Sequence, residues 1–134
     1  MSRNSQVTQE FTISQLAEEF DISTRTIRFY EEKGLIAPRR SKGNQRIYTR
    51  RDRARLRWIL RGKRFGYSLD EIAEMMGMND IDMNEADQIK NTLEYGERKL
   101  LEIKTRVEEL MLLEQDILTI KEKLIDRLAE IERA

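Results

Sequence analysis

Apolar residues recur at helical spacing along most of the chain, and this pattern predicts a mainly α-helical protein. The first helix is expected over 13–20, where four apolar side chains share one face. Thr12 and Gln15 stand just before it in the arrangement of a capping box, in which each side chain satisfies the other residue's backbone N–H. Residues 1–10 are polar and show no period, so we expect a flexible N-terminal arm.

A second helix is predicted from Ser23, a good N-cap, to Lys33, with Gly34 ending it. About three residues separate it from the first helix, which is the spacing of a helix-turn-helix. After Pro38, the stretch 39–48 has Gly and Asn where a tight turn needs positive φ. We therefore predict a β-hairpin, or wing, behind the second helix.

Two further helices follow the wing. Thr49 and Asp52 open a third helix that ends near Arg64, and Ser68 with Glu71 forms another capping box that opens a fourth helix over 69–76. Together these elements predict a domain over 11–77, which a linker over 78–84 joins to the rest of the chain.

Residues 85–134 contain no Pro and carry an apolar heptad repeat, which predicts a coiled-coil dimerisation helix. A helix of this length reaches roughly 70 Å, so a domain of this size cannot cover it and its seam must meet another helix. The repeat places Glu114 and Lys121 at seam positions, where unpaired charges are costly, and Leu113 and Ile120 widen the apolar face beside them. The seam residues that we expect in a homodimer are Leu93, Leu100, Ile103, Val107, Leu110, Ile117, Leu124 and Leu128.

The formal net charge is zero, but the charge is distributed unevenly. Residues 1–68 contain 16 Lys and Arg against 7 Asp and Glu, whereas residues 69–134 contain 9 against 18. A basic half of this kind is typical of proteins that bind a polyanion such as nucleic acid.

The chain has no Cys and no His, which excludes disulfides, thiolate metal sites and His-based catalysis. We expect no cofactor, no metal site and no catalytic residue. No apolar run approaches the ~18 residues of a membrane span, and the N-terminus lacks a signal-peptide core. The prediction is a cytoplasmic protein without a membrane partner.

The second helix carries hydrogen-bonding side chains that suit a DNA groove. Arg25 is expected to contact a base, because a guanidinium can bridge O6 and N7 of guanine, while Arg28 and Tyr30 hold phosphates. Arg39, Arg40, Lys42 and Arg46 lie on the predicted wing, where they can neutralise backbone phosphates. The alternative for the second helix is a charged face that is only solvated. The alternative for the wing is an edge strand that its charges protect from pairing with another strand.

Several motifs together resemble the MerR family of transcriptional regulators. They are Thr26-Ile27-Arg28-Phe29-Tyr30-Glu31, Gly34-Leu35-Ile36, Gln45-Arg46-Ile47-Tyr48 and Phe65-Gly66-Tyr67-Ser68-Leu69. The resemblance implies a winged helix-turn-helix dimer on a palindromic operator of double-stranded DNA, which it distorts so that RNA polymerase can engage the promoter. The DNA-binding residues expected from the motifs and the pattern are Ser23, Thr24, Arg25, Thr26, Arg28, Tyr30, Arg39, Arg40, Lys42, Gln45, Arg46, Tyr48, Lys63, Arg64 and Tyr67.

Residues 45–49 and 59–64 also resemble the subgroup that controls leucine/isovalerate and acyl-CoA catabolism. Any small-molecule effector must fit between the DNA-binding domain and the dimerisation helices, or be absent. A group of methionines, Met75, Met76, Met78 and Met83, suits either such a pocket or core packing. A coiled-coil scaffold that binds nucleic acid without sequence preference is the competing function, and nothing in the sequence supports an enzyme.

Overall fold

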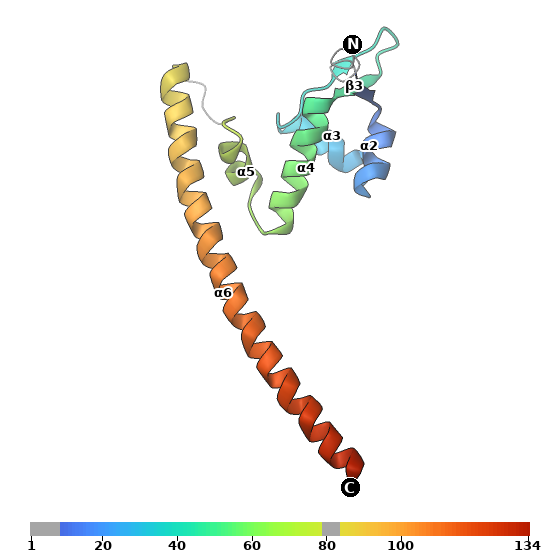
Figure 1. Cartoon of the computed structure of the whole chain (residues 1–134). Helices are drawn as coiled ribbons and strands as arrows, with labels where there is room; N and C mark the ends of the chain where they lie inside the picture. Colours follow the sequence, from blue (N-terminus) through green and yellow to red (C-terminus); the bar gives the residue numbers. More distant parts are fainter. Residues whose placement is uncertain (1–8, 79–83) are drawn as a thin grey trace, which may run out of the picture. The chain divides into compact units, whose positions relative to one another are not determined.

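The computed structural model describes residues 9–78 and 84–134, and the chain divides into two compact units on either side of residue 84. We call residues 9–78 the head and the helix of the second unit the rod (Figure 1). The head contains, in order, β1 (Glu10–Phe11), α2 (Ile13–Phe20), α3 (Thr24–Glu32), β2 (Arg39–Arg40), β3 (Arg46–Thr49), α4 (Arg50–Arg64) and α5 (Leu69–Met75). The rod is α6 (Glu85–Arg133). The predicted fold class, a winged helix-turn-helix followed by a long helix, is confirmed.

The predicted helix starts are confirmed by their caps. The Thr12 backbone N–H donates to Gln15 Oε1 at 2.8 Å, and the Gln15 N–H donates to Thr12 Oγ1 at 3.1 Å. The same reciprocal pair opens α4 at Thr49 and α5 at Ser68. Each cap satisfies backbone donors that a helix leaves open at its N-terminus.

The helix-turn-helix consists of α2, a short turn and α3. Asp21 ends α2 in the left-handed conformation (φ 53°), and Ser23 then caps α3 by accepting a hydrogen bond from the Thr26 N–H at 3.0 Å. The second helix ends at Glu32, one residue before the predicted end, and Gly34 (φ 76°) supplies the positive φ that turns the chain away.

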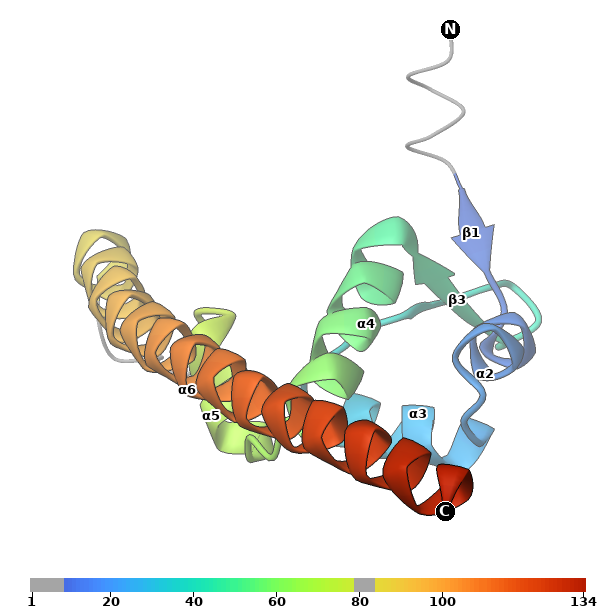
Figure 2. The same ribbon diagram turned by 60° about the horizontal axis from the view of Figure 1, so that its bottom comes forward.

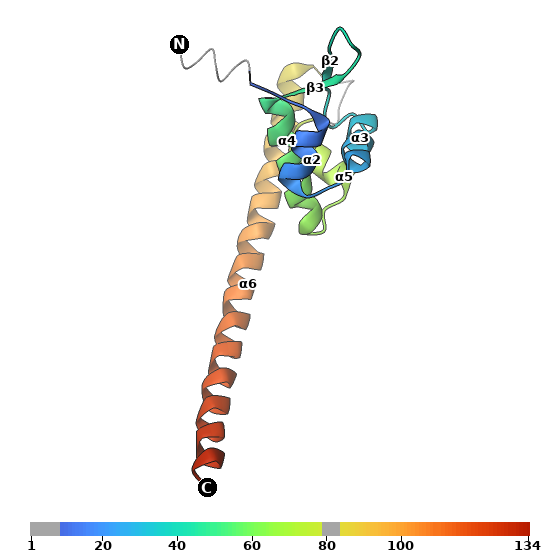
Figure 3. The same cartoon turned by 90° about the vertical axis from the view of Figure 1, so that its right-hand side faces the viewer.

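A three-stranded sheet of order β1-β3-β2 holds the wing, and both strand pairs are antiparallel. The expected flexible arm over 1–10 is wrong at its end, because Glu10 belongs to β1 and pairs with Thr49 (Figure 2). Residues 1–8 of that arm lie outside the described residues. The β2–β3 hairpin projects beyond the helices of the head (Figure 3).

The head has its own hydrophobic core. Its fully buried side chains come from every helix of the head, from β3 and, for Ile36, from the loop between α3 and β2: Leu16, Ile27, Ile36, Tyr48, Leu56, Ile59 and Ile72. Gly62 lets α5 approach α4 closely, because a Cβ at that position would lie 2.8 Å from Cδ1 and Cγ1 of Ile72. Met76 and Met78 pack against this core, as the packing alternative predicted, and Met83 lies outside the described residues.

The rod buries none of its residues. Asn84 caps its N-terminus by accepting a hydrogen bond from the Asp87 N–H at 2.9 Å. Among the helices that the structure describes, none has the length and hydropathy of a membrane span.

Candidate nucleic-acid interface

The exposed residues of α3 are Arg25, Arg28, Phe29 and Glu32. Arg25 and Arg28 are exposed and, three residues apart, lie on the same face of the helix. Ser23 and Thr26 bond to each other through their hydroxyls at 2.9 Å, so both also serve the cap of α3. Thr24 is half-buried. The two arginines are therefore the longest side chains that this face offers to a ligand.

Tyr30 does not lie on this face. We predicted it to be exposed, and this is wrong: its exposed fraction is 6% and it belongs to the core. Tyr30 follows Ile27 by three residues, so both side chains point inward from one side of the helix. Burial raises the pKa of the Tyr30 hydroxyl. Phe29 is exposed instead, with the Lys33 ammonium 5.4 Å from its ring centre.

The wing carries basic side chains that are already engaged within the head. Arg39 forms an ion pair with Glu10 of β1, and Arg40 Nη1 donates to the Asn44 carbonyl at 3.1 Å. Lys42 and Gln45 are exposed at the tip of the hairpin. The structure thus brings these wing residues together on one projecting hairpin.

An ion pair connects the wing to α3. Arg46 Nε lies 2.6 Å from Glu31 Oε2, and both side chains are about three-quarters covered, with exposed fractions of 26% and 22%. The hydrogen bond to Glu31 raises the pKa of the Arg46 guanidinium. We did not predict Glu31 as a partner. The available signal was the lack of acidic residues within 39–64 other than Asp52, which means that the wing's counter-charges come from elsewhere.

Tyr48, which we expected among the DNA-binding residues of the wing, is instead wholly buried. It pairs with Phe11 across the sheet and faces the core, because alternate residues of a strand point to opposite sides. Its hydroxyl has no hydrogen-bond partner among the described residues. Burial, reinforced by the nearby Glu31 carboxylate, raises the pKa of Tyr48 to about 12.

The arginines of α4 separate into different environments. Arg53 binds Glu19 of α2 through two nitrogens, with an Nη2–Oε2 distance of 2.5 Å, and Arg57 lies 3.8 Å from the same carboxylate. Burial lowers the pKa of the Arg55 guanidinium. Part of the basic run therefore holds the head together and does not form a single surface for a partner.

The last three predicted DNA-binding residues lie at the end of α4 and in the turn after it. Lys63 and Arg64 are exposed, whereas Tyr67 is half-buried and packs against the core. Arg64 also borders a hollow of ≈ 230 Å³ whose other lining residues are Phe20, Ile22, Arg57, Leu60 and Arg61. Its lining therefore combines three arginines with three apolar side chains.

Every predicted dimerisation residue of the rod is exposed. The exposed fractions run from 44% for Ile103 to 63% for Leu93. The other exposed seam residues are Leu100, Val107, Leu110, Ile117, Leu124 and Leu128. An aliphatic stripe of this length in contact with water costs free energy, at roughly 25 cal/mol per Å² of apolar surface.

Two family models match the chain. The model described as "MerR HTH family regulatory protein" matches residues 11–78, and the model described as "MerR, DNA binding" matches residues 53–120. The first covers the described head, and the second extends from α4 into the rod.

Individual proteins resemble the chain over most of its length. The mercuric resistance operon regulatory protein of Bacillus cereus is 30% identical over 115 residues, or 85% of each chain. The regulator CueR of Salmonella typhimurium is 34% identical over 112 residues, covering 82% of this chain and 78% of CueR. The crystal structure of HiNmlR, a MerR family regulator lacking the sensor domain, bound to promoter DNA, superposes with a TM-score of 0.57 at 29% identity, covering 76% of each chain.

Proposed function

Since the chain belongs to the MerR family of helix-turn-helix transcriptional regulators, which are not enzymes, we propose that it binds a palindromic promoter operator as a homodimer. The observation that carries this proposal is the pair of exposed arginines on α3, next to a projecting basic wing. The proposed boundaries are a DNA-binding domain over 11–77, a linker over 78–84 and a dimerisation helix over 85–134.

In the proposed complex α3 enters the major groove. Arg25, near the helix N-terminus, contacts a base edge, and Arg28 holds a phosphate. The exposed residues Lys42, Lys63 and Arg64 neutralise backbone phosphates on either side of α3. Tyr30 and Tyr48 act differently: they pack the core that fixes α3 and the wing in place.

The rod is the part of the chain that binds the second copy in the proposed homodimer. A homodimer with two-fold symmetry presents two identical α3 helices, and such a dimer matches an operator whose half-sites are inverted repeats. The bare aliphatic stripe of α6 supports this assignment, because pairing with a second rod removes it from water. Its length then determines how far apart the two heads are held.

The promoter is the proposed site of action, since the similar regulator HiNmlR was crystallised on promoter DNA. We propose that distortion of the operator gives RNA polymerase access to the promoter, and that the genes controlled serve amino-acid or acyl-CoA catabolism, from the resemblance of residues 45–49 and 59–64. The mercuric function in the name of the B. cereus relative does not carry over. This chain has no Cys, whose thiolate is a ligand that soft metals prefer.

Binding of operator variants by Arg25→Ala and Arg28→Ala tests the proposal. Arg28→Ala weakens binding to all sequences alike. It also lowers the slope of the logarithm of the binding constant against the logarithm of salt concentration by about the contribution of one phosphate contact. Arg25→Ala instead reduces the preference for one base of each half-site, an effect of about 1–3 kcal/mol. Fluorescence anisotropy over a range of salt concentrations measures both effects.

Two outcomes contradict the proposal. If Arg25→Ala binds every operator variant with unchanged ratios, Arg25 does not contact a base. If the wild-type chain shows a steep salt dependence but no sequence preference, the chain is the non-specific nucleic-acid-binding scaffold that the sequence left as the competing function.

A further inference from the structure

The apolar stripe of the rod moves to a different set of heptad positions at Leu110. On the N-terminal side the stripe runs through Leu100, Ile103 and Val107, in alternating steps of three and four residues. On the C-terminal side, the exposed apolar residues that lie between Leu110 and about 80° to one side of it are Leu113, Ile117, Ile120, Leu124, Leu128 and Ile131, whereas Met111, Leu112, Leu118 and Ile125 are exposed in other directions. Leu110 therefore lies three residues from its neighbour in the stripe on each side, and Leu124 lies four residues from its neighbour on each side.

Helix geometry shows what this change does to the two charged residues of the heptad pattern. Each residue of an α-helix advances by about 100°, so Leu113 and Ile120 lie about 60° and 80° to one side of Leu110. Glu114 and Lys121 lie on the opposite side of it, at about 40° and 20°. Over this segment an entirely aliphatic face is available, and the two charges form its border.

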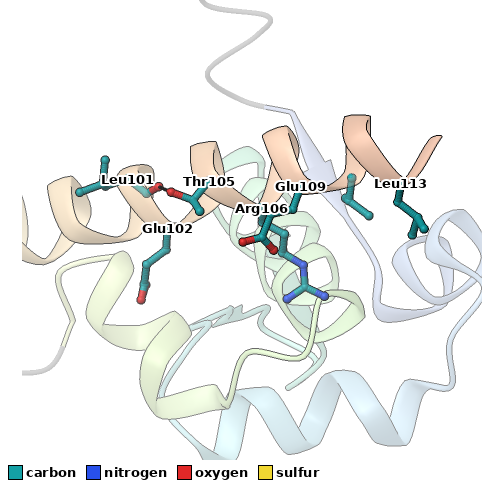
Figure 4. Close-up of a pocket in the computed structure, with 7 residues that line it drawn as sticks. Leu101, Glu102, Thr105, Arg106, Glu109 and Leu113 are labelled. Carbon is teal, nitrogen blue, oxygen red and sulfur yellow. Dashed lines mark hydrogen bonds between the residues drawn. The ribbon is translucent and has the colours of Figure 1, made fainter. Parts of the chain in front are cut away.

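On the N-terminal side of Leu110 the arrangement is reversed. Glu102 and Arg106 occupy the side of the helix that Leu113 occupies further on, and Figure 4 shows these three side chains extending to the same side of α6. Glu102 and Arg106 border a hollow of ≈ 710 Å³ that also includes Leu110 and Leu113. The aliphatic residues here lie on the other side, at Ile103 and Val107, so the charged border changes sides at Leu110.

A second hollow extends from the shifted face past Lys121 to Ile125. It measures ≈ 350 Å³ and is lined by Ile117, Ile120, Lys121, Leu124, Ile125 and Leu128. In a coiled coil, a side chain of the facing helix enters a space bordered by four residues at such spacings. Lys121 can place its methylene stem along this space while its ammonium stays in water.

We propose that the seam of the homodimer shifts at Leu110 to Leu113 and Ile120 and returns at Leu124, so that Glu114 and Lys121 lie beside the seam. The occupant of the stripe is a second copy of this chain, as in the proposed function on which this inference rests. An added step of three overwinds a coiled coil locally and an added step of four unwinds it, so the two changes together restore the heptad register. An unshifted seam would enclose four charges, two from each chain.

Matched alanine variants of the full-length chain test the shift. The equilibrium constant for dimer dissociation, measured by sedimentation, rises about tenfold or more in Leu113→Ala and in Ile120→Ala, because each dimer loses two buried side chains. Their neighbours Glu114→Ala and Lys121→Ala change it less than about threefold, as surface charges do. The reverse order overturns the shift, since an unshifted seam makes loss of the buried charges the larger effect.

Thiol protection provides a second measurement that does not depend on dimer strength. Because the chain has no Cys, each of Leu113→Cys, Glu114→Cys, Ile120→Cys and Lys121→Cys introduces a single thiol. At concentrations where the chain is dimeric, a maleimide reacts more slowly at 113 and 120 than at 114 and 121, and denaturant removes the difference. Slower reaction at 114 and 121 overturns the shift while leaving the homodimer intact. A chain that stays monomeric at every concentration removes both the shift and the homodimer of the proposed function.

Discussion

The head and the rod are stabilised in opposite ways. The head encloses completely buried side chains from α2 to α5, among them Tyr48 and Ile72, whereas the rod buries none of its residues. Charge changes sign close to the same boundary, since residues 1–68 contain an excess of basic residues, and residues 69–134, which include α5 and the rod, contain an excess of acidic ones.

This difference indicates where each part obtains its stability. The head has a core and can hold α3 and the wing in place by itself. The rod's aliphatic stripe gains burial only from another helix, so its stability depends on association. We propose that the acidic half is also repelled by DNA while the basic half is attracted, so that the chain is oriented before contact.

A charge within the seam has the largest expected effect. Leu110→Asp places two carboxylates in the dimer interface, so we expect loss of the dimer and at least a hundredfold loss of operator affinity. Near-ultraviolet circular dichroism of Trp58, the single Trp of the chain, reports misfolding of the head. Sedimentation of the full chain reports dissociation of the dimer. Leu112→Asp is the matched control, because Leu112 is exposed but lies about 200° around the helix from Leu110.

If Leu110→Asp remains a dimer at the concentrations at which the wild type dimerises, the rod does not associate through this stripe. If Leu112→Asp dissociates equally, the interface is not confined to one face of α6. The first result removes the contrast between a self-sufficient head and a dependent rod, whereas the second keeps that contrast and rejects a seam on a single face.

Truncation in the head has the next largest effect and acts on stability alone. Tyr48→Ala removes a fully buried ring and costs about 3–5 kcal/mol of unfolding free energy. Tyr48→Phe stays within about 1 kcal/mol of the wild type, because the lost hydroxyl has no partner among the described residues. Urea denaturation of both variants checks the pair, and a large loss in Tyr48→Phe would point to a hydrogen bond of this hydroxyl.

Alkaline pH weakens the head through the same residue. The folded pKa of Tyr48, about 12, exceeds its ordinary value of 10.0, so burial of the neutral phenol contributes its stability fully below pH 10. That contribution, about 2–3 kcal/mol, is lost as the pH rises from 10 towards 12. Stability of the wild type therefore falls more steeply over this window than that of Tyr48→Phe. Parallel curves would show that Tyr48 ionises as freely in the folded chain as in the unfolded one.

The smallest effect concerns the ion pair between α2 and α4. The hydrogen bond from Arg53 lowers the pKa of Glu19, so this pair stabilises the head above about pH 4.5 and the gain disappears as the pH falls below that value. Because a third of each side chain is exposed, Glu19→Gln costs less than about 1 kcal/mol at pH 7. Urea denaturation at pH 7 and pH 3 measures this, and an equal loss at both pH values would exclude the charge as its cause.

Features set by neighbouring residues could be predicted from the sequence. The capping boxes at Thr12, Thr49 and Ser68 involve residues three apart, and the structure contains all of them. The heptad repeat likewise predicted a continuous helix, which α6 confirms. In these cases the information lies within a few residues of the chain.

Features that join distant residues could not be predicted in the same way. β1 has two residues and no periodicity of its own, and it exists because Glu10 and Phe11 pair with β3. The partners of Arg46 and Arg53 lie 15 and 34 residues away, at Glu31 and Glu19. A long-range ion pair leaves no local pattern, so each arginine looked like a free basic residue.

The prediction that Tyr30 and Tyr48 lie at the DNA surface failed for a related reason. Tyr30 and Tyr48 carry a hydroxyl that suits DNA contacts, and they stand in motifs of the MerR resemblance, but a large ring also suits a core. Only packing decides between the two uses, and the structure places both rings inside. Their contribution to the proposed interface is to fix the positions of α3 and β3.

Selection of bound DNA from a random pool by the full-length chain tests the central claim most directly, that two heads joined by their rods bind one palindrome. We predict enrichment of inverted half-sites with a single fixed centre-to-centre spacing, and loss of that spacing in Leu110→Asp. Enrichment of isolated half-sites by the wild type, or no enriched sequence at all, would contradict it.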